Sequence, residues 1–352
     1  MNLSILKPEF RSLETDAAGF SRGARRAFTL VEVLVVVTIL SLIILALMSV
    51  FSSTQRAFRA SVTQTDVMQG GHAAMELIAA DLRGAVPCGG YAPVPNAANP
   101  LQPSPFSGEA TNGINFFVTN NGLSYSPLLQ SLPGSSTTTV QRTNLLQWFF
   151  VLGRQNTQWT GVGYFVDTAA ATALYPLYRY YSTTNITINP AVLFNNFVAT
   201  VNAGYFNESL LNSSNNMSHV MDGVVHLVIR AYDPNGMLMT NGYVYNNLGT
   251  GMTNVNNTWF TPPYPLLPLP GGEVGFVMSS NALPASVEVQ MGVLEDRTIK
   301  RATSLNPGQP VFTTASGWTS SAQQNYLQAQ SGTTQVFRER VTLQNVDPTA
   351  YQ

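Results

Sequence analysis

Charged side chains are scarce in this chain, where they make up 10% of the 352 residues, against about 25% in an average soluble protein. The 17 basic and 18 acidic residues leave a formal net charge of -1. This near-neutral balance argues against nucleic acid as a partner, because phosphate binding needs a basic surface. The single cysteine, Cys88, excludes an intrachain disulfide framework and a cysteine-rich metal cluster. These shortages argue against an ordinary cytosolic enzyme.

Histidine is also rare, with three residues in the chain. His219 and His226, with Asp222 between them, could be metal ligands, but His226 alternates within an expected strand and no Cys or Glu lies at ligand spacing. Residues 233–236 (DPNG) resemble the start of a calcium loop. An EF-hand loop would need Glu at its end, where this chain has Val244, so a hairpin turn is favoured. We therefore expect no metal and no cofactor.

Motifs that would identify an enzyme are missing as well. We find no nucleophile elbow, phosphate loop or paired-acid arrangement, so the sequence predicts a non-catalytic protein. One alternative for the aromatic residues is a carbohydrate-stacking face, although strand alternation places at least half of them in the core. These residues are Trp148, Phe149, Phe150, Tyr164, Phe165, Tyr178, Tyr180 and Tyr181.

Against this background one long apolar segment stands out. Residues 28–51 carry a single charge, Glu32, and as a helix would span about 36 Å, enough to cross a hydrocarbon core of about 30 Å. The run is too long for the apolar region of a secretory signal peptide, which makes a plain signal anchor the stronger alternative. An anchor leaves Glu32 unexplained, because a carboxylate in lipid costs a few kcal/mol. The basic residues that precede the run keep residues 1–27 cytoplasmic and export the rest: they are Arg22, Arg25 and Arg26.

The junction Arg25-Arg26-Ala27 followed by Phe28-Thr29-Leu30-Val31-Glu32 resembles the class III signal of type IV pilins and type II secretion pseudopilins. The resemblance implies that prepilin peptidase cleaves between Ala27 and Phe28, and that Phe28 is then N-methylated. Ala27 stands where the family usually has Gly, and the leader is long. Glu32 becomes the fifth mature residue. The implied partners are the peptidase, other pilins or pseudopilins, and an inner-membrane assembly platform.

Glu32 has a physical role in this scheme. Cleavage leaves a positively charged amine on Phe28, and the Glu32 carboxylate of a neighbouring subunit can neutralise it, since paired charges are tolerated where single ones are not. Such a pair would also fix the axial register between subunits, as a lone polar group does in a helical bundle.

The helix is predicted to continue well beyond the membrane. Apolar residues recur at three- and four-residue steps as far as Val86, and Pro87 should end the helix. Gly70-Gly71 is a predicted weak point or bend. Residues 87–113, rich in Pro, Gly, Asn and Ala, are expected to form a linker or irregular loop.

The remaining sequence has the two-residue period of strands. The expected strands are residues 114–119, 145–152, 162–167, 177–181, 224–233, 241–245, 274–278, 285–296 and 335–346. A short surface helix is expected at 321–330. Residues 182–222 and 247–272 are interpreted as long polar insertions.

The order of the strands resembles that of J-type minor pseudopilins, W-type minor pilins and pilin-like cassette proteins of the Verru_Chthon type. The matching segments are Gly161–Asp167 with Leu177-Tyr178-Arg179, Asp222–Asp233, Leu283–Val289 and Phe337–Leu343. The expected fold class is α+β, a long N-terminal helix packed on an antiparallel β-sheet domain. The expected division is a leader (1–27), a transmembrane part (28–51), a stalk (52–86), a linker (87–113) and a β-rich globular domain (114–352).

The sequence thus predicts a non-catalytic minor pilin or pseudopilin, nearest the J-type. It would be a single-pass inner-membrane protein with a periplasmic domain, assembled in or near the tip of a pseudopilus or type IV pilus. The alternative is a surface protein on a plain signal anchor that binds polysaccharide through its aromatic and Asn-rich loops.

Overall fold

The computed structural model describes residues 29–89, 113–120, 128–131, 141–170, 173–204, 216–239, 254–255, 258–260, 275–313 and 317–347. Two compact units make up the chain, Met1–Arg59 and Ala60–Gln352. The predicted leader and residues 90–112 of the predicted linker lie outside the described residues, as does the expected strand at 241–245.

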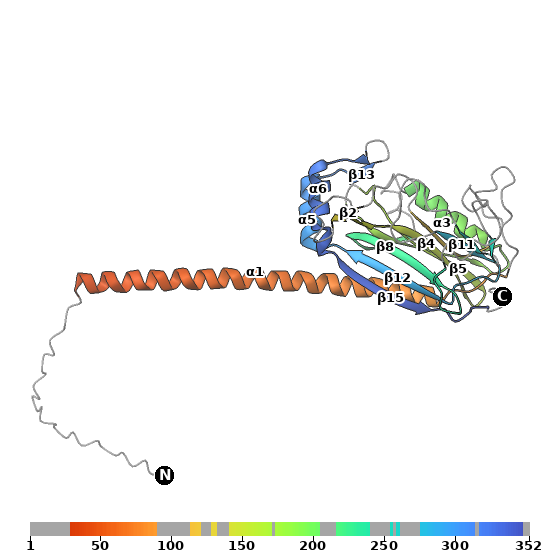
Figure 1. Cartoon of the computed structure of the whole chain (residues 1–352), viewed down its shortest axis with the longest axis horizontal. Coiled ribbons are helices and arrows are strands. Elements are labelled where there is room, and N and C mark those ends of the chain that lie inside the picture. Colours follow the sequence, from red (N-terminus) through yellow and green to blue (C-terminus); the bar gives the residue numbers. More distant parts are fainter. Residues whose placement is uncertain are drawn as a thin grey trace, which may run out of the picture. The chain divides into compact units, whose positions relative to one another are not determined.

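Helix α1, Leu30–Arg83, is the dominant element of the N-terminal part of the chain (Figure 1). It ends at Arg83 rather than at the predicted Val86 because the next residues join the sheet. Ala85 forms an isolated antiparallel bridge with Gly153, and the Val86 amide donates to the Leu152 carbonyl at 2.9 Å. Sheet hydrogen bonds thus replace the last expected turn of the helix.

The helix passes through Gly70 and Gly71 without interruption, and the predicted bend does not occur there (Figure 1). The two glycines have different surroundings. A Cβ on Gly71 would lie 2.2 Å from a ring carbon of Phe337, whereas a Cβ on Gly70 would meet its nearest neighbour, Met221, at 4.0 Å. Gly71 is therefore a packing residue, which leaves the space that the Phe337 ring occupies.

Replacing the two glycines should have opposite effects on stability. Gly70→Ala should stabilise the protein by up to about 1 kcal/mol through helix propensity. Gly71→Ala should destabilise it by about 1–3 kcal/mol, because the new methyl group overpacks the site. Thermal unfolding of the full chain in detergent measures both changes, and Phe337→Leu added to Gly71→Ala should recover part of the loss. Equal shifts for the two alanine variants would contradict this account of Gly71.

The largest sheet has eight strands in the order β7-β6-β5-β4-β1-β11-β10-β9, and all its pairings are antiparallel. Its strands are β1 (Ile114–Asn120), β4 (Gln147–Gln155), β5 (Gln158–Val166), β6 (Leu177–Asn185), β7 (Met217–Met221), β9 (Asn254–Val255), β10 (Thr258–Phe260) and β11 (Phe276–Ser279). Strands β9 and β10 lie within a stretch that was predicted to be an insertion.

A second antiparallel sheet has the order β15-β12-β8. Its strands are β8 (Val224–Tyr232), β12 (Ser286–Val293) and β15 (Gln335–Thr342). It meets the large sheet beside β4, where the Gln147 side chain accepts a hydrogen bond from the Ile229 amide at 2.7 Å. Two further pairs are β2 (Leu128–Ser131) with β3 (Gln141–Asn144), and β13 (Phe312–Thr313) with β14 (Gly317–Trp318). The predicted antiparallel α+β fold is confirmed.

Both faces of the central strands of the large sheet are largely buried. One face packs against the second half of α1 and the three-stranded sheet, and carries Phe116, Phe149 and Tyr164. The other packs against helix α3, Ala191–Gly204, and carries Phe117 and Phe150. This arrangement explains why strands such as β4 are almost continuously apolar, as in sheets covered on both sides.

Helix α3 corrects the prediction that residues 182–222 are a polar insertion. Strand β6 continues into this stretch, α3 follows, and β7 returns to the sheet. Asn189 starts α3 by accepting a hydrogen bond from the Ala191 amide at 3.0 Å. Buried Phe194 and Phe197 anchor the helix, although its Asn-rich flanks resemble a loop.

Two more helices come late in the sequence and lie side by side at one end of the globular unit (Figure 1). Helix α6, Ser321–Gln330, matches its prediction, and the Ser320 side chain caps it by accepting from the Gln323 amide at 3.3 Å. A short 3-10 turn, η2 (Ser331–Thr333), follows. Helix α5, Asp296–Leu305, was not predicted; the strand expected to reach residue 296 ends at Val293 instead.

Candidate functional site

The first turn of α1 holds the one predicted assembly residue that the structure describes. Thr29 precedes the helix, and its hydroxyl oxygen accepts a hydrogen bond from the Glu32 amide at 3.3 Å. Thr29-Leu30-Val31-Glu32 also has the sequence of a capping box. The Glu32 side chain is exposed, and a carboxylate at this end of a helix is favoured by the helix dipole. Sequence reasoning missed this local role of Thr29.

The other predicted processing and topology residues lie outside the described part of the chain. They are Arg22, Arg25, Arg26, Ala27 and Phe28.

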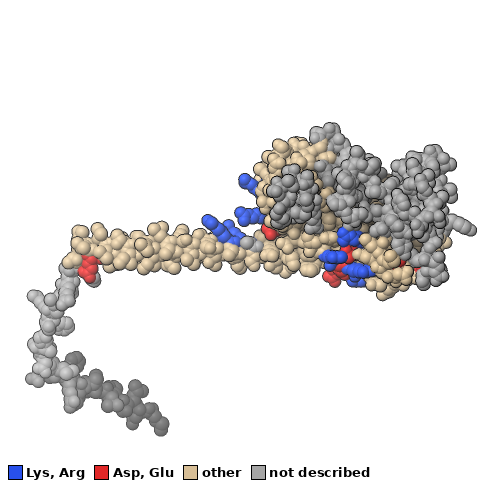
Figure 2. All heavy atoms as spheres, in the orientation of Figure 1, with Lys and Arg blue, Asp and Glu red and all other residues tan. Residues whose placement is uncertain are grey.

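The apolar part of α1 has no packing partner among the described residues of its own unit. Every described side chain from Thr29 to Arg59 is exposed, including Leu30 at 81% and Phe51 at 61%. Figure 2 shows this stretch as a largely uncharged surface. The helix is long and apolar enough to cross a membrane. A surface of this kind needs lipid or other apolar helices around it.

Several hydroxyl side chains within this stretch donate hydrogen bonds to carbonyl groups of the preceding turn. Thr38 donates to the Val35 carbonyl and Ser41 to the Val37 carbonyl, each at 2.8 Å. Hydroxyl groups bonded in this way are tolerated in hydrocarbon. Glu32 differs, because its carboxylate has no hydrogen-bond partner among the described residues. It is the one charged group of α1 before Arg56, and it requires a partner from outside.

The second half of α1 belongs to the globular unit and is held there by a regular stripe. Its buried residues recur at three- and four-residue steps, which is the period of one helix face. They are Val67, Gly71, Ala74, Met75, Ile78, Ala79 and Leu82. The predicted helical spacing in this region is confirmed, and burial of the stripe fixes the helix against both sheets.

An acidic residue on this half of α1 forms an ion pair and hydrogen bonds with the large sheet. Both carboxylate oxygens of Asp81 accept hydrogen bonds from the Arg179 guanidinium, each at 2.8 Å, and the Tyr164 hydroxyl donates to the same carboxylate. The Asp81 and Arg179 side chains are 13% and 19% exposed. This bidentate pair is mostly shielded from water, where such geometry is strongest.

The contacts among Asp81, Arg179 and Tyr164 shift the pKa values of the last two residues. Burial raises the pKa of the Tyr164 hydroxyl well above its usual range, and the negative charge of Asp81 raises it further. The hydrogen bond to Asp81 raises the pKa of Arg179, so Arg179 stays charged at any physiological pH. Arg179 was noted in the sequence only as part of Leu177-Tyr178-Arg179. The signal that could have located its partner is an acid, Asp81, among the apolar residues of the α1 stripe.

A second ionic cluster lies on the three-stranded sheet. The Glu288 carboxylate is 6% exposed and binds Arg230 at 3.0 Å and Arg338 at 2.7 Å. Beside it, the Arg340 guanidinium stacks over the Tyr232 ring at 3.9 Å from the ring centroid. Burial raises the pKa of Glu288, but the hydrogen bonds and charges of Arg338 and Arg230 outweigh it and hold the pKa below its ordinary value of 4.5.

This shift predicts an acid-sensitive contribution to stability. Because the folded state lowers the pKa of Glu288, its contribution is present above about pH 4.5 and is lost as the pH falls through the folded value. The free energy of unfolding should therefore drop on acidification below this pH. Glu288→Gln should be less stable at pH 7 and lose less stability in acid. Denaturant unfolding between pH 3 and 7 tests this, and the same acid loss in both proteins would contradict it.

The candidate metal ligands lie in different settings. His219, on β7, is exposed and bonds Asp222 at 2.8 Å. His226 is buried in β8, and its Nδ1 accepts a hydrogen bond from the Leu145 amide at 3.2 Å. No group of three or more His, Cys, Asp or Glu side chains in the described residues could hold a metal.

Residues 233–236 form the predicted turn. The Asp233 carbonyl accepts a hydrogen bond from the Gly236 amide. The Asp233 carboxylate accepts one from the Met237 amide at 2.7 Å. Gly236 has a positive φ of 79°, which suits glycine.

Cys88 is a free, half-buried thiol just beyond α1.

The aromatic residues do not form a stacking face. Seven of the eight candidates are buried, and Tyr181 is partly buried beneath Arg179, whose guanidinium lies 5.0 Å from the ring centroid. Helix α3 covers the sheet face that sequence reasoning left open. The proposed carbohydrate platform on these residues is therefore wrong.

Comparison with known proteins gives one result. A family model described as the prokaryotic N-terminal methylation motif matches residues 22–48, which include the predicted cleavage junction, Glu32 and the first turns of α1. Searches of curated proteins and of solved structures give no match. The motif indicates a membrane-anchored, pilin-type protein that prepilin peptidase processes. This chain therefore combines a type IV pilin-like methylation signal with a pilin-like α+β architecture.

Proposed function

We propose that this protein is a non-catalytic minor pilin or pseudopilin, nearest the J-type, assembled in or near the tip of a type II secretion pseudopilus or type IV pilus. One observation carries the proposal: the methylation motif at residues 22–48 coincides with an exposed apolar helix in which Glu32 is the one charged residue before Arg56. A plain anchor requires no such acid.

In this proposal the chain begins as a single-pass protein of the inner membrane. Residues 1–27 are cytoplasmic and the globular unit is periplasmic, as the three arginines before the apolar run favour. Prepilin peptidase cuts between Ala27 and Phe28, and Phe28 is methylated. The apolar half of α1 then leaves lipid for the core of a filament, where the corresponding helices of other subunits surround it.

Glu32 directs this transfer. Its carboxylate lies in the first turn of α1 without a partner among the described residues, close in sequence to the amine that cleavage creates. Pairing with the amine of a neighbouring subunit neutralises both groups and sets the axial register. Neither the helix dipole nor the Thr29 cap can supply such register, because both act within one chain.

The globular unit supports the J-type assignment through the order of its strands. Leu177-Tyr178-Arg179 opens β6, and Arg179 holds α1 through Asp81. The segment Leu283–Val289 leads into β12, and Phe337–Leu343 lies largely in β15. In this proposal the sheets present a surface to neighbouring subunits or exported substrates. The protein acts by assembling with other subunits and catalyses no reaction.

The proposal is tested by locating the chain in its native cells. Filaments sheared from the cells should contain the mature chain at low abundance, and a strain without prepilin peptidase should retain it in the membrane. Finding the chain in the membrane alone, while other pilin-type subunits of that strain are recovered in sheared filaments, would contradict the proposal.

A further inference from the structure

The outer surface of α5 and α6 carries a basic hollow that the proposed function does not use. It measures about 570 Å³ and is lined by Arg297, Lys300, Arg301 and Ser304 of α5 and Tyr326 of α6. This volume is within the range of about 300–1,000 Å³ for small-ligand sites. Lysine and arginine side chains project from this end of the globular unit (Figure 2).

Two of the three positive charges that line the hollow are not neutralised by carboxylates among the described residues. Lys300 pairs with Asp296 at 2.6 Å, but no ion pair joins Arg297 or Arg301 to a described carboxylate. By contrast, Arg179 binds Asp81, and Arg338 binds Glu288. The arginines of α5 therefore keep their donors available to an external anion.

The position of Arg297 on α5 does not serve the stability of the helix. Arg297 is the second residue of α5, and the last turn of the helix has no basic residue. Cations near the start of a helix are opposed by its dipole, whereas the same dipole attracts anions. This arrangement favours a role in binding over a role in folding.

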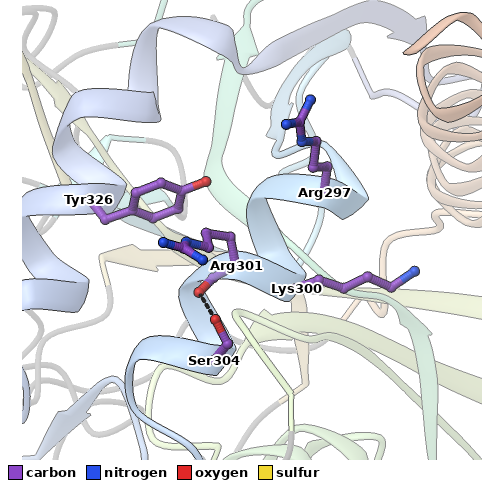
Figure 3. Close-up of a pocket in the computed structure, with 5 residues that line it drawn as sticks. All are labelled: Arg297, Lys300, Arg301, Ser304 and Tyr326. Carbon is purple, nitrogen blue, oxygen red and sulfur yellow. Dashed lines mark hydrogen bonds between the residues drawn. The ribbon is translucent and has the colours of Figure 1, made fainter. Parts of the chain in front are cut away.

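The walls of the hollow indicate which anion fits. Figure 3 shows the Arg301 guanidinium facing the Tyr326 ring, while Lys300 points to the other side. Arginine offers planar, paired donors that match carboxylate and phosphate groups. The Tyr326 ring adds an amphipathic surface with a hydroxyl at its tip. No carboxylate lines the hollow, so its charged groups are donors only.

We propose that this hollow binds an acidic glycan, with a sugar carboxylate or phosphate on Arg301, the sugar ring against Tyr326 and a further acidic group of the glycan on Arg297. A carboxylate on a polypeptide would need the two arginines but not the aromatic wall. The site lies on α5 and α6 alone and does not depend on assembly through α1.

The intact chain, purified in detergent, can be tested with polygalacturonate as the acidic glycan and dextran as the neutral one. Biolayer interferometry should show salt-sensitive binding of polygalacturonate and none of dextran, because exposed charges are screened by salt. Arg301→Gln and Arg297→Gln should each weaken binding about tenfold, the effect of one charged hydrogen bond. Tyr326→Leu should weaken it while keeping an apolar residue against α5.

Arg154→Gln is the matched control, since Arg154 is an exposed arginine of β4 far along the chain from the hollow. It should leave binding unchanged. The proposal fails if polygalacturonate does not bind, if the control weakens binding as much as Arg301→Gln, or if Tyr326→Leu binds as well as the natural chain. Tighter binding of duplex DNA or of polyglutamate than of polygalacturonate would also overturn the glycan assignment.

Discussion

Glu32→Gln should leave the protein in the membrane but remove it from filaments. The amide keeps the size of the side chain while abolishing the charge that would neutralise the amine of a neighbouring Phe28. An unpaired charge in an apolar environment costs about 3 kcal/mol, so incorporation should fall about 100-fold. The amount of chain in sheared filaments, relative to the amount in membranes, measures this effect.

Two further variants separate pairing from local helix stability. Glu32→Asp retains the charge and should keep partial incorporation, whereas Glu32→Leu should insert well and assemble poorly. Thr38→Ala is the matched control, because Thr38 is another polar residue of the apolar stretch whose hydroxyl is already bonded to Val35; it should assemble normally. Normal assembly of Glu32→Gln and Glu32→Leu would show that α1 is a plain anchor.

Asp81→Asn should cause a large loss of stability in the globular unit. The substitution leaves the Arg179 charge without its partner in a setting where that side chain is 19% exposed. Breaking a buried ion pair from one side costs about 3–5 kcal/mol, and the residual exposure places the expected loss near the lower end, about 3 kcal/mol. Denaturant unfolding of the full chain, followed by tryptophan fluorescence, measures it.

The exposed pair between Arg83 and Glu339 provides the control for this prediction. It lies near the same end of α1, with a separation of 3.3 Å and side chains that are 53% and 37% exposed. Arg83→Gln should change stability by less than about 1 kcal/mol, because exposed pairs are screened by solvent. Equal losses for Asp81→Asn and Arg83→Gln would contradict the claim that Asp81 and Arg179 lock the helix to the sheet.

Much of the fold follows from short-range patterns in the sequence. The apolar run and the three- to four-residue spacing predict α1, and the Ser320 cap accompanies α6 at its predicted bounds. The turn at residues 233–236 is also readable, since Asp, Asn and Gly have specific turn conformations. These elements depend on local chemistry, so a single sequence contains their signals.

The errors arise where distant segments decide the outcome. The sequence does not indicate helix α3, because its Asn-rich flanks resemble a loop. Its apolar face becomes recognisable only in the folded chain, where it covers the large sheet. The same omission left the aromatic strands apparently open on one side. The sequence indicates a weak point or bend at Gly71 because the residue that packs against it, Phe337, is remote in sequence. The pairing of Asp81 with Arg179 spans 98 residues, a distance at which residue types alone do not identify partners.

The candidate site divides in the same way. Glu32 and the basic flank are predictable because processing and membrane insertion depend on linear sequence. The contacts that hold α1 to the sheets, and the basic hollow on α5 and α6, required the folded chain. Local signals thus located the segment that the methylation motif matches, whereas the features of the globular unit depend on its tertiary structure.

Mass spectrometry of the mature N-terminus tests the central claim most directly. Protein from cells with active prepilin peptidase should give a peptide that begins at N-methylated Phe28, and cells without the peptidase should lack it. A chain that retains residues 1–27 in peptidase-positive cells would reduce the apolar half of α1 to an ordinary anchor. Cleavage after residue 51 would instead indicate a secreted domain, and either result would contradict assembly through Glu32.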